Sequence, residues 1–168
     1  MIAVQHDDFD AGQLIRELHE RSQGQAGAVA SFVGYVRDYS ASQPTQELFL
    51  EHYPGMCEQE LADIAQQAMQ RWDIVQSTIV HRVGALSRQQ QIVFVGIASA
   101  HRGDAFAACE YIMDALKTRA PFWKRETLAD GKAFWVQARN SDQQRLEKWS
   151  ASQDVTAQAE TPEQEGHK

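Results

Sequence analysis

Hydrophobic residues follow two spacings along this chain, and each spacing predicts a different kind of element. Apolar positions three or four residues apart predict helices that end near Arg21, over 57–72 and over 105–118, with a short one at 142–149. Asp8 and Asp10 are candidate caps of the first helix. Short continuous or alternating apolar runs predict strands, over 2–4, 28–36, 48–53, 74–83, 91–100, 122–128 and 132–138.

Breaks in the pattern predict where the chain turns. Gly34 interrupts an almost continuously apolar run, which indicates a bulge or a close backbone approach. Asp130-Gly131 is typical of a two-residue hairpin turn. Pro121 ends the helix before it, because proline disfavours helical backbone in the preceding residue. The element order, with several short connections, predicts an α+β domain with antiparallel strand pairs.

Composition narrows the class of protein. The chain has 168 residues with a net charge of −7, which argues against general nucleic-acid binding. We expect one domain over residues 1–149 and a disordered tail over 150–168, where large apolar residues are almost absent. Cys57 and Cys109 are far apart and fall in predicted helices, so a reduced, cytoplasmic setting is expected. The sequence shows no signal peptide and no apolar run long enough to span a membrane.

The basic segment KTRAPFWKRE, residues 117–126, is unexpected in an acidic chain. Lys117 falls in the last helical turn, and alternation places Lys124 on the strand face of Phe122 and Glu126, opposite Trp123 and Arg125. A lone lysine there would ordinarily complement the helix dipole or lie exposed on a strand. Two lysines on either side of a proline corner also suit a functional pair, because crowded cations call for an anion among them.

A second candidate anion site is His101-Arg102-Gly103, where a central apolar strand leads into a helix. Backbone N–H groups and the helix dipole favour an anion there, and Arg102 can grip a phosphate or carboxylate through two hydrogen bonds. Arg37, at the end of another buried strand, is a weaker candidate. Each of these side chains could equally be a satisfied loop or surface residue.

The remaining reactive residues give no catalytic signature. The other histidines lack metal-ligand spacing, namely His6, His19, His52, His81 and His167. His52 and His81 are interpreted as strand-surface residues or partners in local hydrogen bonds. Cys109 falls on a buried helix stripe, where a thiol is inert. The residues alone therefore indicate an anion site of Arg, His and Lys, with a lysine as a possible catalytic group and no metal.

Five segments in order resemble the catalytic (large) subunit family of molybdopterin synthase. They are SFVGYVRD (31–38), LEHYPGM (50–56), HRVG (81–84), VFVGIASAHRGDAF (93–106) and IMDALKTRAPFWKRE (112–126). The resemblance implies an α/β hammerhead-type domain with an added small antiparallel β lobe. It also implies sulfur transfer from the C-terminal thiocarboxylate of a small ubiquitin-like partner to cyclic pyranopterin monophosphate (precursor Z), which forms the molybdopterin dithiolene. The implied assembly is a heterotetramer around a homodimer of large subunits, with no cofactor.

The resemblance also assigns roles. Lys117 would be an acid–base residue or a cation that stabilises an oxyanion, and Lys124 would bind substrate and move protons. The remaining implied substrate-binding residues are Tyr35 and Val36 through their backbone, Arg37, His101, Arg102, Arg125 and Glu126. Tyr35 stands where some members have lysine, so its side chain is given no catalytic role. The implied dimer leaves open that a site borrows residues from a neighbouring protomer.

Two other functions fit the same residues. A binding module would capture the C-terminal carboxylate of a small protein in the basic groove without any chemistry. An acyltransferase acting on a phosphate-bearing substrate would need a nucleophile or a pantetheine site, and the sequence shows neither.

Overall fold

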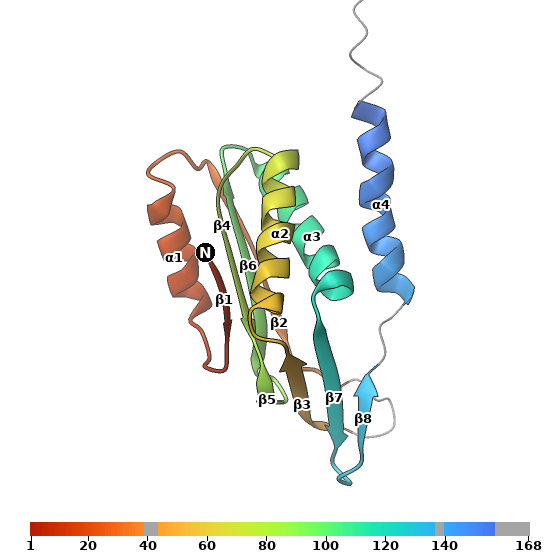
Figure 1. Cartoon of the computed structure of the whole chain (residues 1–168). Coiled ribbons are helices and arrows are strands. Elements are labelled where there is room, and N and C mark those ends of the chain that lie inside the picture. Colours follow the sequence, from red (N-terminus) through yellow and green to blue (C-terminus); the bar gives the residue numbers. More distant parts are fainter. Residues whose placement is uncertain (39–43, 137–139, 157–168) are drawn as a thin grey trace, which may run out of the picture.

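The computed structural model describes residues 1–38, 44–136 and 140–156, over which the chain forms two four-stranded sheets and four helices (Figure 1). We call the first the main sheet. Its strands, in order across the sheet, are β1 (Ile2–Gln5), β4 (Ile74–Arg82), β6 (Gln91–Ser99) and β2 (Ala28–Tyr35). β1 pairs with β4 in parallel, whereas β6 is antiparallel to both of its neighbours.

Helices cover both faces of the main sheet. On one face lies α1 (Ala11–Arg21), whose Leu18 packs over the sheet at Gly96. A Cβ atom at Gly96 would lie 2.9 Å from Leu18 Cδ2 and 2.7 Å from the Phe94 ring, so only glycine leaves room for both side chains.

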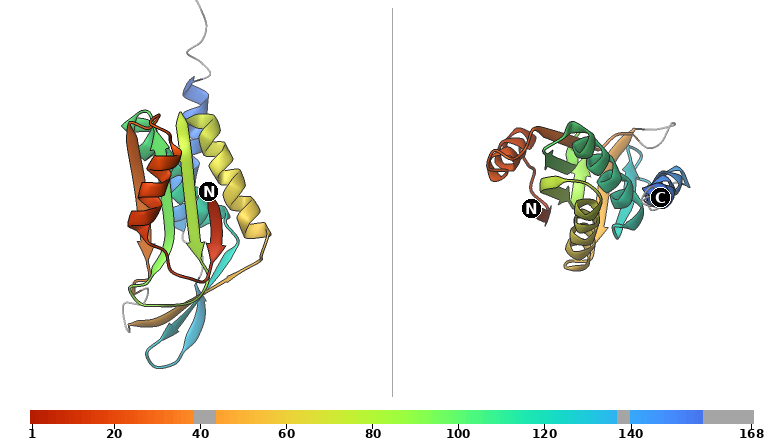
Figure 2. Two further views of the ribbon diagram at one scale, coloured as in Figure 1. Left: turned by 90° about the vertical axis from the view of Figure 1, so that its left-hand side faces the viewer. Right: turned by 90° about the horizontal axis from the view of Figure 1, so that it is seen from above.

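The larger core lies on the other face of the main sheet. There α3 (Arg102–Arg119) packs on β6, and α2 (Met56–Arg71) packs on β1 and β4. Val95 and Ile97 of β6 belong to this buried core. A fourth helix, α4 (Asn140–Thr156), packs along α3. Viewed from above, α1 and α4 lie on opposite sides of the molecule (Figure 2). None of the described helices is long and apolar enough to cross a membrane.

The second sheet extends beyond the end of the main sheet at which β2 and β4 finish (Figure 1). All of its strand pairs are antiparallel. Its strands, in order, are β5 (Gly84–Ser87), β3 (Thr45–His52), β7 (Phe122–Leu128) and β8 (Ala133–Val136). The structure therefore confirms an α+β fold with a small antiparallel lobe.

Local turn chemistry agrees with the sequence at several places. Asp10 caps α1, because its carboxylate accepts a hydrogen bond from the Gln13 N–H at 3.0 Å. The β2–β6 register shifts between Gly34 and Tyr35, which is the predicted irregularity. The predicted hairpin between β7 and β8 is present, but residues 129–132 join the strands, so its turn is longer than the two residues expected. Gly131 in this turn has φ of +84°, a conformation that favours glycine.

Other expectations were wrong. Met69 and Phe106 have the helical spacing of the predicted helices 57–72 and 105–118, which favours burial, yet they are 51% and 66% exposed. The strand β5 was not predicted, and β3 begins at Thr45 rather than at residue 48. α4 continues to Thr156, so the segment predicted to be disordered begins within a helix. The rest of that predicted tail, residues 157–168, lies outside the described residues.

Candidate active site

A cavity of about 490 Å³ lies where the end of β2, the last turns of α3 and the first half of β7 come together. Its wall is largely apolar, with polar groups at a few points. The polar side chains that line it belong to Tyr35, Arg37, His81, Lys117, Lys124 and Asp142. An apolar wall with a few convergent polar groups is the usual form of a small-molecule site.

Lys117 and Lys124 reach this cavity from two different elements. Lys117 belongs to the last turn of α3 and Lys124 to the middle of β7. Between them Ala120 is extended, at φ −67° and ψ 128°, as expected for the residue before a proline. The Phe122 N–H then donates to the Ala120 carbonyl at 2.8 Å, which completes the corner. The bend at Pro121 therefore leaves both lysines lining one cavity, one from each element (Figure 1).

Arg37 lines the same cavity from the segment after β2. Val36 is buried and anchors this segment, because its N–H donates to the Gln90 carbonyl and its carbonyl accepts from the Gln89 N–H. Asp38 pairs with Arg88 at 3.6 Å on the other side of Arg37. These two bonds hold the backbone of Val36 next to Arg37. Tyr35 lines the cavity and is 53% exposed.

The other two cations of the basic segment are engaged elsewhere. Arg119 pairs with Glu60 of α2 at 2.7 Å, and it also donates to Gln67. The guanidinium of Arg125 lies over the rings of Phe49 and Trp135, at 5.1 and 5.9 Å from their centroids. Within one chain Arg125 therefore does not line the cavity, and its expected contact with substrate stays a prediction.

Glu126 is also outside the cavity. Its side chain is fully buried, and its Oε1 accepts a hydrogen bond from the Thr45 hydroxyl. Oε2 has no hydrogen-bond partner among the described residues. The carboxylate thus ties β7 to the start of β3, close to Lys124 in the sequence but sealed from the ligand space.

His101 and Arg102 lie at the opposite end of α3 from Lys117. His101 precedes the first turn of that helix, and both residues are exposed. Lys117 lies fifteen positions after Arg102 in α3, and at about 1.5 Å of rise per position this is roughly 22 Å. A single chain therefore does not bring these two residues to the cavity.

His81 is the cavity residue that the sequence analysis missed. It is 7% exposed, and its ring stacks on Phe122 with centroids 3.9 Å apart and an interplanar angle of 11°. Burial lowers the pKa of His81 to about 4, and the nearby charges of Lys124 and His52 act in the same direction. The available signal was a histidine that directly follows the apolar pair Ile79-Val80 in a predicted strand, where a buried imidazole must find a hydrogen bond.

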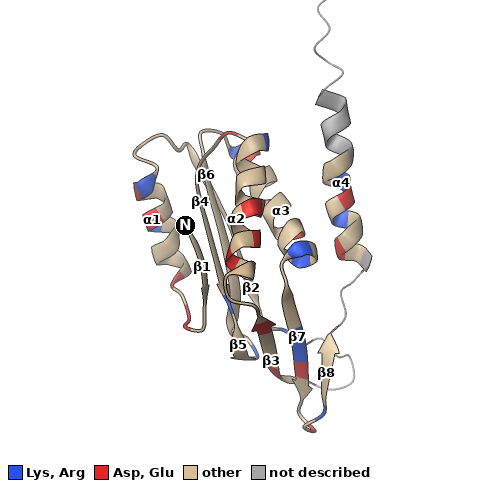
Figure 3. Ribbon diagram, in the orientation of Figure 1, with Lys and Arg blue, Asp and Glu red and all other residues tan. Residues whose placement is uncertain are grey.

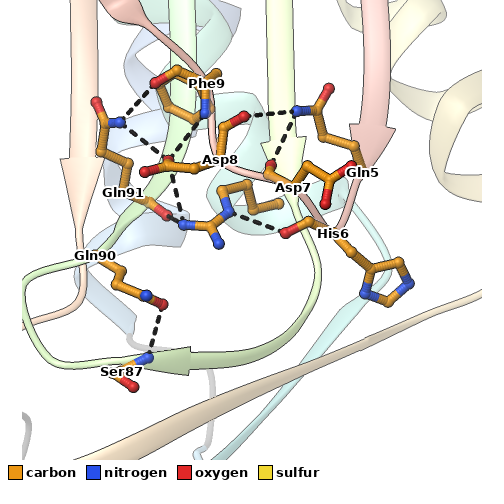
Figure 4. A network of polar contacts seen from close by, with 9 residues as sticks. Gln5, His6, Asp7, Asp8, Phe9, Ser87, Gln90 and Gln91 are labelled. Carbon is orange, nitrogen blue, oxygen red and sulfur yellow. Dashed lines mark hydrogen bonds and ion pairs between the residues drawn. The ribbon is translucent and has the colours of Figure 1, made fainter.

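A polar network fixes the backbone next to His81 (Figure 4). The guanidinium of Arg82 is nearly buried and donates to the carbonyls of His6 and Gln91, at 3.2 and 3.0 Å. It also pairs with the Asp8 carboxylate at 3.3 Å, and the Gln91 amide donates to the same carboxylate. These bonds fasten the β1–α1 connection to the ends of β4 and β6, so the strand end that carries His81 is held from two sides.

The polar side of this site is dominated by cations. Lys and Arg residues occur at the end of α3 and on β7, although the chain as a whole is acidic (Figure 3). Arg37, Lys117 and Lys124 together can hold an anion in a partly desolvated space, where electrostatic attraction is stronger than in water. Among the described residues, no group of three or more His, Cys, Asp or Glu side chains is placed to hold a metal ion.

Comparison with known proteins gives this cavity a context. The sequence model of the MoaE protein family matches residues 4–119, more than half of the chain. The chain belongs to the MoaE protein family. It is 50% identical over 171 aligned positions to the molybdopterin synthase catalytic subunit of Ralstonia nicotianae, with 99% of this chain and 96% of the relative covered. The family resemblance seen in the five sequence segments is thereby confirmed.

Solved structures of the family agree with the fold. The molybdopterin biosynthesis MoaE protein from Burkholderia ambifaria superposes with a TM-score of 0.76 at 48% identity, covering 89% of this chain and 97% of that one. The molybdopterin synthase from Staphylococcus aureus superposes with a TM-score of 0.73 at 30% identity, covering 80% and 95%. The two-sheet architecture that frames the cavity is therefore the fold of this family.

Proposed function

We propose that this chain is the catalytic subunit of a molybdopterin synthase. In this role it transfers sulfur from the C-terminal thiocarboxylate of a small ubiquitin-like partner to cyclic pyranopterin monophosphate, and two transfers form the dithiolene. The observation that carries the proposal is the meeting of Lys117, Lys124 and Arg37 in one cavity, in a chain whose close relatives are molybdopterin synthase catalytic subunits.

The charges of the cavity suit these reactants. The sulfur donor is an anionic thiocarboxylate and the acceptor carries a phosphate, so the site must hold two anions close together. Fixed cations in a partly desolvated cavity supply that attraction without a metal ion. We assign the phosphate to Arg37 and the thiocarboxylate to the neighbourhood of Lys117. A nucleophilic cysteine is not required, because the partner supplies the sulfur.

The roles of the lysines follow from the bonds that change. The thiocarboxylate sulfur bonds to a carbon of the pterin and displaces an oxygen substituent, which leaves as water once protonated. Water then cleaves the resulting thioester, which leaves the sulfur on the pterin and a carboxylate on the partner. Lys117 stabilises the oxyanion formed during this cleavage, and Lys124 donates the proton to the leaving oxygen.

His101 and Arg102 enter this proposal from a second copy of the chain. They lie about 22 Å along α3 from Lys117, too far to contact the same small substrate within one protomer. In a homodimer they would complete the anion site of the neighbouring protomer, and each dimer would carry two partner subunits. The two cysteines are free and buried, which supports the cytoplasm as the setting of this assembly.

Reconstitution tests the proposal directly. This protein is mixed with a thiocarboxylated partner and precursor Z, and dithiolene formation is measured over time. We expect the wild-type protein to convert the pterin, and Lys117→Ala to bind the partner but lose at least about 100-fold in turnover. Lys132→Ala is the matched control, because Lys132 is 78% exposed on the β7–β8 turn and pairs with Asp130.

The outcomes separate the candidate functions. Partner binding without pterin conversion by the wild-type protein would favour a module that only captures the C-terminal tail. Near-normal turnover by Lys117→Ala would remove Lys117 from the reaction while leaving the sulfur-transfer activity in place.

A further inference from the structure

His81 forms part of the cavity wall, yet the reaction described above gives it no task. Its ring is fixed on two sides. One face stacks on Phe122, and Nδ1 lies 2.8 Å from the carbonyl oxygen of Arg82. The Arg82 network in turn holds that stretch of β4 (Figure 4). An imidazole held in this way presents its remaining nitrogen in one direction.

The contact with Arg82 determines which ring nitrogen carries the proton. A backbone carbonyl can only accept a hydrogen bond, so Nδ1 must be the N–H donor. Burial keeps the ring neutral at physiological pH, because the pKa is lowered to about 4. In a neutral ring with hydrogen on Nδ1, the other nitrogen, Nε2, has a free lone pair and acts as an acceptor.

Nε2 is the ring nitrogen of His81 that the described part of the fold leaves without a partner. No hydrogen bond joins it to any of the described residues. Among the described residues, Glu126 Oε2 is the one side-chain oxygen or nitrogen that is both fully buried and without a hydrogen-bond partner. Nε2 of His81 has no partner among these residues either, so it is not fully buried. His81 lines the cavity, so the ligand space is the open space next to its ring.

We propose that His81 is a substrate-contacting residue whose Nε2 accepts a hydrogen bond from an N–H or O–H group of the bound pterin. The inference rests on the proposed function, which supplies a heterocycle rich in such donors with a phosphate attached. A lone pair repels an anion, whereas Arg37, Lys117 and Lys124 attract one. The phosphate of the pterin therefore binds away from His81. The edge of the pterin that carries N–H and O–H donors faces His81.

Two substitutions at His81 separate the two nitrogens. Asparagine places an amide near the position of Nδ1 and can keep the bond to the Arg82 carbonyl, but it leaves nothing at Nε2. Glutamine reaches the position of Nε2 and can offer its amide oxygen there. We expect His81→Asn to raise KM for the pterin roughly three- to tenfold, with an unchanged Kd for the partner, and His81→Gln to recover most of that loss. Equal effects of both variants, or no effect of either, would overturn the proposal.

A measurement on the wild-type protein avoids dependence on variants that fold poorly. Nitrogen NMR of protein labelled with ¹⁵N-histidine, in complex with its partner, reports which nitrogen of His81 carries hydrogen. We expect an unprotonated Nε2 whose resonance moves when precursor Z is added and stays in place when inorganic phosphate is added. A protonated Nε2, or a resonance that ignores the pterin, would contradict the proposal.

The same samples distinguish a failure of this inference from a failure of the proposed function. If the wild-type protein forms dithiolene while the Nε2 resonance stays in place, the sulfur transfer stands and the role of His81 falls. If the resonance moves without any product, His81 contacts the pterin in a protein that does not carry out the reaction.

Discussion

Burial of His81 makes the stability of the fold depend on pH. The pKa of His81 is lowered from 6.5 to about 4 in the folded chain, mainly by desolvation. Below pH 6.5, His81 therefore binds a proton in the unfolded chain. In the folded chain it binds that proton only when the pH falls to about 4. Stability from this residue is fully present above pH 6.5 and is lost as the pH falls. We expect a loss of about 2 kcal/mol between pH 8 and pH 5.

Urea unfolding at the two pH values measures this loss, and His81→Asn isolates it. Other groups titrate in both proteins, so the relevant quantity is the difference between their pH dependences. The wild-type protein should lose about 2 kcal/mol more than the variant on going to pH 5. Equal losses in the two proteins would show that His81 is not buried in its neutral form.

At the scale of single residues, the sequence predicted faces better than surroundings. Strand alternation placed Lys124 and Arg125 on opposite faces of β7, and they line the cavity and cover Phe49 respectively. Alternation also placed Glu126 on the face of Lys124, but it could not show that Thr45 closes over that carboxylate. His81 was overlooked because the histidines were judged by metal-ligand spacing, which says nothing about burial.

At the scale of elements, Pro121 fixes how α3 meets β7. Replacing it with alanine removes the steric restriction on Ala120 and lets the corner sample helical backbone. We expect a loss of stability of only about 0.4–1 kcal/mol, because the effect acts mainly through the unfolded chain. Turnover should fall more, on the order of tenfold, since misplacing one lysine by an ångström weakens its contribution to the reaction.

Pro54→Ala is the matched control for this substitution. Pro54 precedes Gly55 in the turn before α2 and does not line the cavity. The Pro54→Ala substitution should lower the free energy of unfolding, measured in urea, by an amount similar to that for Pro121→Ala. It should leave turnover in the reconstituted reaction unchanged. Equal turnover of the two variants would mean that the corner positions the lysines without help from Pro121.

The elements with a strong local signal were predicted and the weak ones were not. α2 and β6 agree with prediction to within about one residue, because a helical stripe and a continuous apolar run each specify one structure. The short strand β5 has no such run, and its pairing with β3 is a tertiary contact. Phe106 and Met69 follow helical spacing yet are exposed. The spacing defines an apolar face of the helix, but it does not show how much of that face the neighbouring elements cover.

At the scale of the whole molecule, the sequence predicted the cations of the proposed site. It did not predict which of them a single chain brings together. Proximity in the sequence pointed to the two lysines, since the corner at Pro121 is local. It could not show that the N-terminal end of α3 lies about 22 Å from them, because that requires the length of the intervening helix. If His101 and Arg102 serve the same reaction, a second protomer must supply them, and no pattern within one chain describes a contact between two.

Mixing two inactive variants tests this sharing of residues. If each site combines Lys117 of one protomer with His101 of the other, a dimer of Lys117→Ala and His101→Ala has one site with both substitutions and one intact site. At equal amounts half of the dimers are mixed, so activity should return to about a quarter of the wild-type value after subunit exchange. If each site is built from one chain, every site in the mixture carries a substitution, and activity stays at the level of the separate variants. The control mixes Lys117→Ala with Lys124→Ala, which alter the same protomer's cavity. There the mixed dimer has no intact site if only His101 and Arg102 come from the partner, so recovery in this mixture would contradict the proposed division between protomers.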